Sequence, residues 1–163
     1  ITRVCMAPLC ESVPARLAVD AGSCEVTLLA RSGCSDEAFT FSMHGRRNYP
    51  YRKVAGRLDV ELEDGTQDTE YLERLASALP GVLAAARPDI VFYLAGADPH
   101  EHDTLGRLGL TFDGLMRRDA LVLESARAVG VPVAIVIAGG YGREIADTVR
   151  VHANTARVAD SFL

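Results

Sequence analysis

The sequence lacks any apolar run that approaches the roughly 18 residues of a membrane-spanning helix. Its start shows no basic stretch followed by a sustained apolar one, so we expect no secretory signal and assign the chain to the cytoplasm. Excess positive charge is also missing, since 17 basic residues stand against 22 acidic ones. A nucleic-acid partner is therefore not expected, because phosphates require a basic face. Lysine occurs once, as Lys53, which we attribute to codon bias.

The 163 residues are enough for one compact domain with both helices and strands. A hydrophobic content of 48% excludes a disordered chain, because that much apolar surface does not stay solvated. All four cysteines lie among the first 34 residues, with four, thirteen and nine residues between them: Cys5, Cys10, Cys24 and Cys34. These spacings are not the paired pattern of a zinc ribbon, so reduced thiols are expected. Residues 1–38 show weak periodicity and offer one plausible strand, over residues 25–30.

From Phe39 onward the pattern is that of an α/β domain. Strands are expected over residues 39–44, 58–62, 89–95 and 131–138, and the last two are continuous apolar runs typical of buried parallel strands. A first helix begins near Asp68, and Pro80 should kink it or divide it. A second helix has Thr111 as its N-cap and Gly130 as its stop. The alternation predicts a parallel sheet with crossover helices.

A last helix is expected over residues 144–159, with one apolar face formed by Ile145, Val149, Ala153 and Ala156. His152 lies near this face, where we expect a half-buried structural histidine. The adjacent arginine pairs, Arg46–Arg47 and Arg117–Arg118, are expected on solvated surfaces.

Polar residues follow the two apolar strands where each ends. Asp98 comes after a Gly-Ala pair, and Tyr141 comes after Gly139 and Gly140. Ligands of open parallel sheets bind at the carboxyl ends of the strands. An aspartate at such a position can bind a metal, and a tyrosine on a glycine turn can present its hydroxyl to a carbonyl group. A loop cap and a packed aromatic residue are the structural alternatives.

Four segments together resemble the C-terminal half of the histone deacetylase family, closest to its bacterial and class IV type: FTFSMHGRRNYPYRK, DVELEDGTQDTEYL, RPDIVFYLAGADPHEHDTLGRLGLTFDGLMRRD and VPVAIVIAGGYG. The similarity runs from Phe39 to about Ala159. It implies a truncated parallel α/β fold of the arginase–deacetylase type over residues 39–163, preceded by an atypical segment over residues 1–38. The implied activity is zinc-dependent hydrolysis of an acetylated lysine in a protein or of a small acetylated amine.

The resemblance assigns roles residue by residue. Asp98 matches a zinc ligand, and Tyr141 matches the tyrosine that hydrogen-bonds the substrate carbonyl, with Gly139 and Gly140 letting it approach.

Ser42 and Met43 match positions beside a structural potassium ion, which they would bind mainly through backbone and hydroxyl oxygens. Tyr49 matches the wall of the acyl-lysine tunnel.

The departures from the family pattern are equally specific. The Asp-x-Asp-x-His motif with the other two zinc ligands is absent, and so is the family's pair of adjacent histidines. The abrupt loss of resemblance suggests a truncated gene whose upstream part is read in another frame. The alternative function is therefore a non-catalytic fragment, an interaction module. A nucleotide-binding domain ranks lower, because no G-x-G-x-x-G or P-loop pattern occurs. The oligomeric state is left open.

One loop offers substitute ligands. Residues 98–103 hold His100 and His102 between Asp98 and Asp103, and such residues can surround zinc. We expect instead that both histidines are solvated surface residues and that Asp103 is structural. His44, at a strand end, is a candidate for supporting a site residue.

Overall fold

The computed structural model describes residues 16–20 and 38–163, which form a five-stranded parallel sheet flanked by helices. Across the sheet the strands follow the order β3-β2-β1-β4-β5, and every neighbouring pair is parallel. Their bounds are β1 Arg16–Asp20, β2 Ala38–Gly45, β3 Leu58–Leu62, β4 Ile90–Gly96 and β5 Val133–Ala138. All five carboxyl ends therefore meet at one edge of the sheet.

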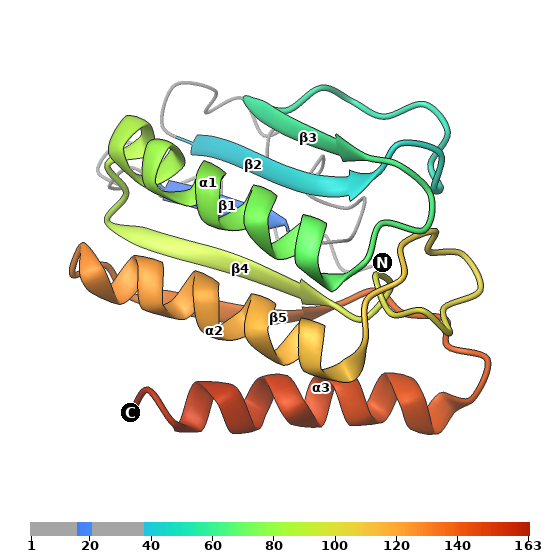
Figure 1. Cartoon of the computed structure of the whole chain (residues 1–163). Helices are drawn as coiled ribbons and strands as arrows, with labels where there is room; N and C mark the ends of the chain where they lie inside the picture. Colours follow the sequence, from blue (N-terminus) through green and yellow to red (C-terminus); the bar gives the residue numbers. More distant parts are fainter. Residues whose placement is uncertain (1–15, 21–37) are drawn as a thin grey trace, which may run out of the picture.

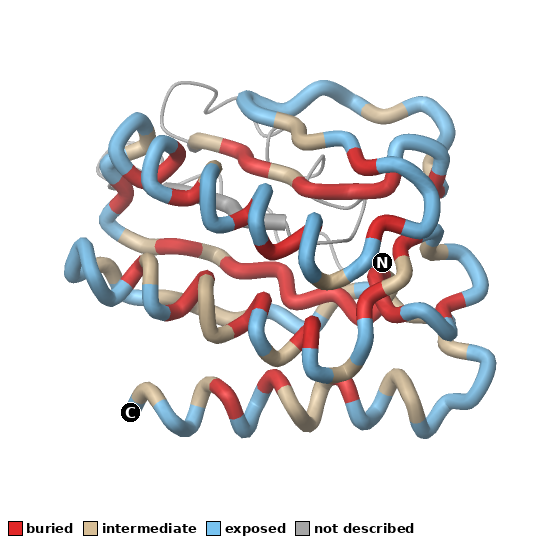
Figure 2. The backbone as a smooth tube through the Cα atoms, viewed as in Figure 1, coloured by how far each residue is buried: buried red, intermediate tan, exposed pale blue. Residues whose placement is uncertain are grey.

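The helices connect these strands and cover the sheet (Figure 1). Helix α1 spans Asp68–Ala86 and α2 spans Phe112–Ala128, and both lie across the same face in Figure 1. Helix α3, Ile145–Asp160, runs alongside α2. The helical layer and the sheet enclose a core in which alternate residues of β2 and β4 are buried (Figure 2): Phe41, Met43, Val91, Tyr93 and Ala95.

The predicted fold class and the elements after Phe39 are confirmed, with bounds that differ by a few residues. Thr111 is the N-cap of α2, and its hydroxyl accepts a hydrogen bond from the Gly114 N–H. Strand β1 was not predicted, yet it is central, since it pairs with β2 on one side and β4 on the other. The four cysteines and the strand predicted over residues 25–30 lie outside the described residues.

Two detailed expectations are wrong, and one of the two alternatives for Pro80 is excluded. Pro80 does not divide α1, which continues for 19 residues because buried leucines on both sides of the proline pack into the core. Helix α3 turns a different face inward: Ile145 and Val149 are exposed, whereas Val151, Thr155 and Val158 are buried. Arg118 is fully buried, not solvated.

Arg118 is buried because it belongs to a polar network that joins α2, α3 and β4. Its guanidinium contacts the Asp119 carboxylate at 2.8–2.9 Å, and its Nη1 donates to the Gly96 carbonyl at 2.7 Å. Asp119 also accepts hydrogen bonds from the Tyr93 hydroxyl at 2.5 Å and from the Thr155 hydroxyl at 2.7 Å. Burial raises the pKa of Tyr93 well above its usual value, so the phenol stays protonated and donates. The network fixes the end of β4, two residues before Asp98.

Within residues 16–20 and 38–163, no helix combines the length and the apolar character needed to cross a membrane.

Candidate functional site

The carboxyl ends of β4 and β5 lie side by side and carry Asp98 and Tyr141. Gly96, the last residue of β4, is paired in register with Ala138, the last residue of β5. One step further, the Ala97 N–H donates to the Gly139 carbonyl at 3.2 Å. The two predicted site residues thus leave the sheet from adjacent strand ends, and Asp98 is half-buried there.

The turn before Tyr141 requires glycine. Gly139 and Gly140 have φ angles of 39° and 129°, in the region that favours glycine. A Cβ atom on Gly140 would also lie 2.8 Å from the Cβ of Ala97, closer than carbon atoms approach. The pair therefore lets the β5 loop run against the β4 loop, and this close approach determines where Tyr141 leaves the sheet.

The main chain of Tyr141 is fixed by hydrogen bonds, whereas its side chain is open to solvent. Its N–H donates to the Asp103 carboxylate, and its carbonyl accepts from the Thr104 N–H at 3.0 Å and the Thr104 hydroxyl at 2.7 Å. The side chain is 65% exposed. A phenol held in this way on a rigid base is available to an external molecule.

Asp103 is structural, as predicted. Besides Tyr141, its carboxylate accepts from the N–H groups of Leu105 and Gly106 at 2.9 and 2.6 Å, which shapes the loop after β4. Gly106 in turn packs so closely on this loop that a Cβ atom would lie 1.8 Å from the Asp98 carbonyl oxygen. Gly106 therefore supports the loop after β4. It was not predicted to do so, because a glycine after Leu105 indicates only a turn in the sequence.

The candidate cation residues lie on β2. Ser42 is half-buried, and its hydroxyl is 2.8 Å from Nδ1 of His44, while the Met43 side chain is buried in the core. Burial, followed by the positive charge of Lys53, lowers the pKa of His44, so its imidazole is neutral near pH 7. A role for Met43 at a cation would have to use its backbone carbonyl, because its side chain packs among apolar residues.

Tyr49 lies in the loop beyond the carboxyl end of β2, at the same edge of the sheet as Asp98 and Tyr141. Its ring is 67% exposed and meets the Tyr51 ring edge to face, with 6.2 Å between the ring centres. That Tyr49 lines a substrate tunnel remains a prediction.

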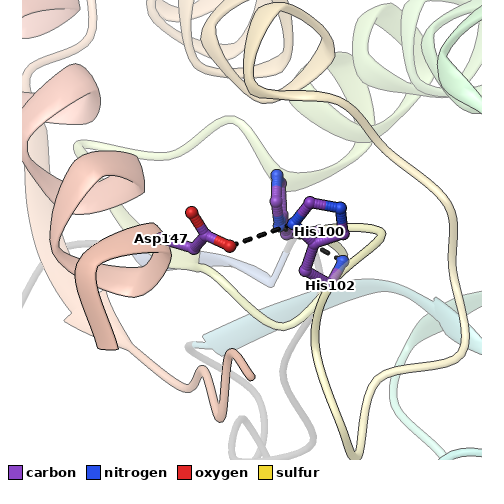
Figure 3. A group of neighbouring side chains, drawn as sticks. All are labelled: His100, His102 and Asp147. Atoms are coloured by element: carbon purple, nitrogen blue, oxygen red, sulfur yellow. Dashed lines mark hydrogen bonds and ion pairs between the residues drawn. The ribbon is translucent and has the colours of Figure 1, made fainter. Parts of the chain in front are cut away.

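The histidines of the loop after β4 do not both lie in solvent. His100 is 3% exposed, against expectation, because its ring packs on the Phe112 ring with 4.1 Å between centres. His102 is exposed, and its Nδ1 lies 2.9 Å from Oδ2 of Asp147. The two histidines and Asp147 form a group of possible metal ligands (Figure 3), and no such group of three in the described part of the chain contains Asp98. The described residues therefore do not complete a zinc site around Asp98.

Comparison with known proteins gives the same family as the sequence motifs. The family model for the histone deacetylase domain matches residues 31–156. An uncharacterized protein of Picosynechococcus sp. is 47% identical over 121 residues, which cover 74% of this chain and 40% of that protein. Histone deacetylase 2 of Arabidopsis thaliana is 33% identical over 124 residues, which cover 72% of this chain and 32% of that protein. The chain thus spans less than half the length of these relatives.

Solved structures confirm the expected fold. An acetylpolyamine aminohydrolase from Burkholderia pseudomallei superimposes with a TM-score of 0.66 at 21% identity, over 91% of this chain and 45% of that one. A histone deacetylase homologue from Aquifex aeolicus gives a TM-score of 0.69 at 22% identity, over 90% and 41% of the two chains. The parallel sheet of this chain corresponds to part of the arginase–deacetylase fold. From its domain match and its relatives, the chain belongs to the histone deacetylase family.

Proposed function

We propose that this chain contributes Tyr141 and Asp98 to a deacetylase-type site that hydrolyses the amide bond of an acetylated amine. The observation that carries the proposal is the placement of these two residues on the adjacent carboxyl ends of β4 and β5. Ligands of parallel sheets bind at that edge. The substrate class is an acetylated lysine side chain or a small acetylated amine, in line with the relatives named a histone deacetylase and an acetylpolyamine aminohydrolase.

Tyr141 would act on the carbonyl group of the acetamide. When water attacks that carbon, negative charge develops on the oxygen, and a phenol that donates a hydrogen bond to it lowers the energy of the transition state. The rigid main chain of Tyr141 serves this role, because Asp103 and Thr104 hold the residue before substrate arrives. A zinc ion, when bound, would polarise the same carbonyl and activate the water, and Asp98 would be one of its ligands. Ser42 and Met43 would hold a potassium ion through oxygen atoms.

A second candidate is a non-catalytic fragment that acts through interaction. One observation favours it: among residues 39–163, whose side chains the structure describes, Asp98 belongs to no group of three possible ligands. A general base and two ligands would have to come from elsewhere.

A deacetylation assay separates the two candidates. The chain, loaded with zinc, is offered a fluorogenic acetyl-lysine peptide and an acetylated polyamine, beside Tyr141→Phe, Asp98→Asn and, as a control, Tyr51→Phe. The proposal predicts turnover that falls by about 100-fold or more in Tyr141→Phe and is unchanged in Tyr51→Phe. Turnover that Tyr141→Phe leaves intact would contradict the assigned role, and the absence of turnover would favour the non-catalytic fragment.

A further inference from the structure

The group formed by His100, His102 and Asp147 lies outside the residues assigned by resemblance. His100 and His102 come from the loop after β4, and Asp147 comes from the first turn of α3. One ligand atom of each lies within 4.8 Å of the others (Figure 3). Two imidazoles and a carboxylate from segments more than forty residues apart are thus brought to one point.

One ring nitrogen of His100 makes no hydrogen bond within the described part of the chain and can therefore coordinate a metal ion. Only 3% of the His100 surface is exposed to solvent. Its Nδ1 accepts one long hydrogen bond, 3.3 Å from the His102 N–H, and its Nε2 is buried with no partner among the described residues. Buried polar atoms are nearly always satisfied. A buried imidazole nitrogen without a hydrogen-bond partner is suited to bind a metal ion.

The charges around the group favour a cation. The carboxylates of Asp147, Glu101 and Asp103 all act on His100 electrostatically. The guanidinium of Arg150 lies over the Phe112 ring, 4.0 Å from its centre, and the same ring contacts the His100 ring.

Distances and donor types fit an ion of the zinc class. Tetrahedral zinc binds histidine nitrogen at about 2.0–2.1 Å and carboxylate oxygen at about 2.0–2.2 Å, so its ligand atoms lie roughly 3.3 Å apart. Nδ1 of His102 and Oδ2 of Asp147 are 2.9 Å apart, so a shared ion would replace their hydrogen bond and move the two atoms apart by a few tenths of an ångström. Closing the remaining separations requires small side-chain rotations, which the His102 side chain, 49% exposed, can make. Imidazole with carboxylate is a donor set that Zn²⁺ accepts well.

We propose that His100, His102 and Asp147 form a binding site for a divalent ion of the zinc class, separate from Asp98. Three protein ligands leave a fourth position for water. The ion would join the loop after β4 to the start of α3. Between these two segments runs the loop that carries Tyr141, which is hydrogen-bonded to Thr104 and, through the Arg143 N–H, to the His102 carbonyl. Metal binding would therefore stiffen the support of Tyr141.

The test measures metal binding, not turnover. Tag-free protein is titrated with Zn²⁺ by calorimetry, and with Co²⁺ by its visible absorption, which reports the coordinating atoms. The variants are His102→Ala and Asp147→Asn, and Asp113→Asn in the first turn of α2 is the control. Asp98→Asn is measured beside them to report any ion that is held at Asp98 instead. Far-ultraviolet circular dichroism shows that each variant is folded.

The proposal predicts one Zn²⁺ per chain at this site and a loss of affinity of about tenfold or more in His102→Ala and Asp147→Asn. The cobalt spectrum changes in the same two variants, and Asp113→Asn leaves the binding unchanged. Binding that survives both ligand substitutions, as it would for metal held by cysteines, overturns the proposal. So does binding that only Asp98→Asn removes, or a wild-type chain that takes up no metal. Because the readout does not depend on hydrolysis, this proposal can fail while the proposed function stands, and the reverse.

Discussion

Replacing Asp119 by asparagine tests the buried network beneath the site. The Asp119 side chain is 1% exposed and its carboxylate balances the charge of Arg118, whose side chain is 0% exposed. Asp119→Asn keeps the size of the side chain but leaves the guanidinium buried without a counter-charge. Removing one partner of a buried ion pair costs about 3–5 kcal/mol. For a domain of this size each kcal/mol shifts Tm by about 2–4 °C, so we expect a decrease of roughly 6–20 °C.

Urea unfolding followed by circular dichroism measures this loss, and a second substitution isolates its cause. Arg118→Met in the Asp119→Asn background removes the unpaired charge, so the double variant should recover part of the stability even though Gly96 loses its donor. Asp113→Asn on the exposed surface of α2 is the control, with an expected change within about 0.5 kcal/mol. A loss below about 1 kcal/mol in Asp119→Asn, or strictly additive effects in the double variant, would refute the reasoning.

Three smaller predictions concern the loops, a cap and pH. Gly140→Ala should destabilise the chain by about 1–3 kcal/mol in urea unfolding, and more than Gly130→Ala, because only Gly140 lies against Ala97; equal losses would exclude the steric contact. Thr111→Ala should cost about 1 kcal/mol by removing the N-cap of α2, whereas Thr111→Ser should not. Burial and the charge on Arg118 lower the pKa of His152 below 6.5, so the folded chain binds fewer protons and loses stability as pH falls below about 6.5. His152→Gln should flatten that pH dependence, and an unchanged curve would contradict it.

The sequence was sufficient for the parts of the fold that local pattern determines. The apolar runs before Asp98 and Tyr141 predicted two parallel strands, and the structure pairs them as β4 and β5. The hydroxyl of Thr111 predicted the start of α2. These features depend on neighbours within a few positions along the chain, where periodicity and capping chemistry are visible.

Long-range contacts explain what was missed. Arg118 looks like one of two surface arginines, and its burial depends on Tyr93 and Asp119, which the fold brings together across α2 and β4. His100 and Asp147 are 47 positions apart, so nothing in the local sequence indicates their proximity. Strand β1 is only five residues long, and its place in the centre of the sheet is set by partners on both sides.

The most direct test of the central claim is the rate of acetyl-lysine peptide deacetylation by the zinc-loaded chain and by Tyr141→Phe, measured side by side. If Tyr141, held by Asp103 and Thr104, polarises the substrate carbonyl, the wild-type chain turns over the peptide and the variant is slower by about 100-fold or more. Equal rates in the two proteins would contradict the account.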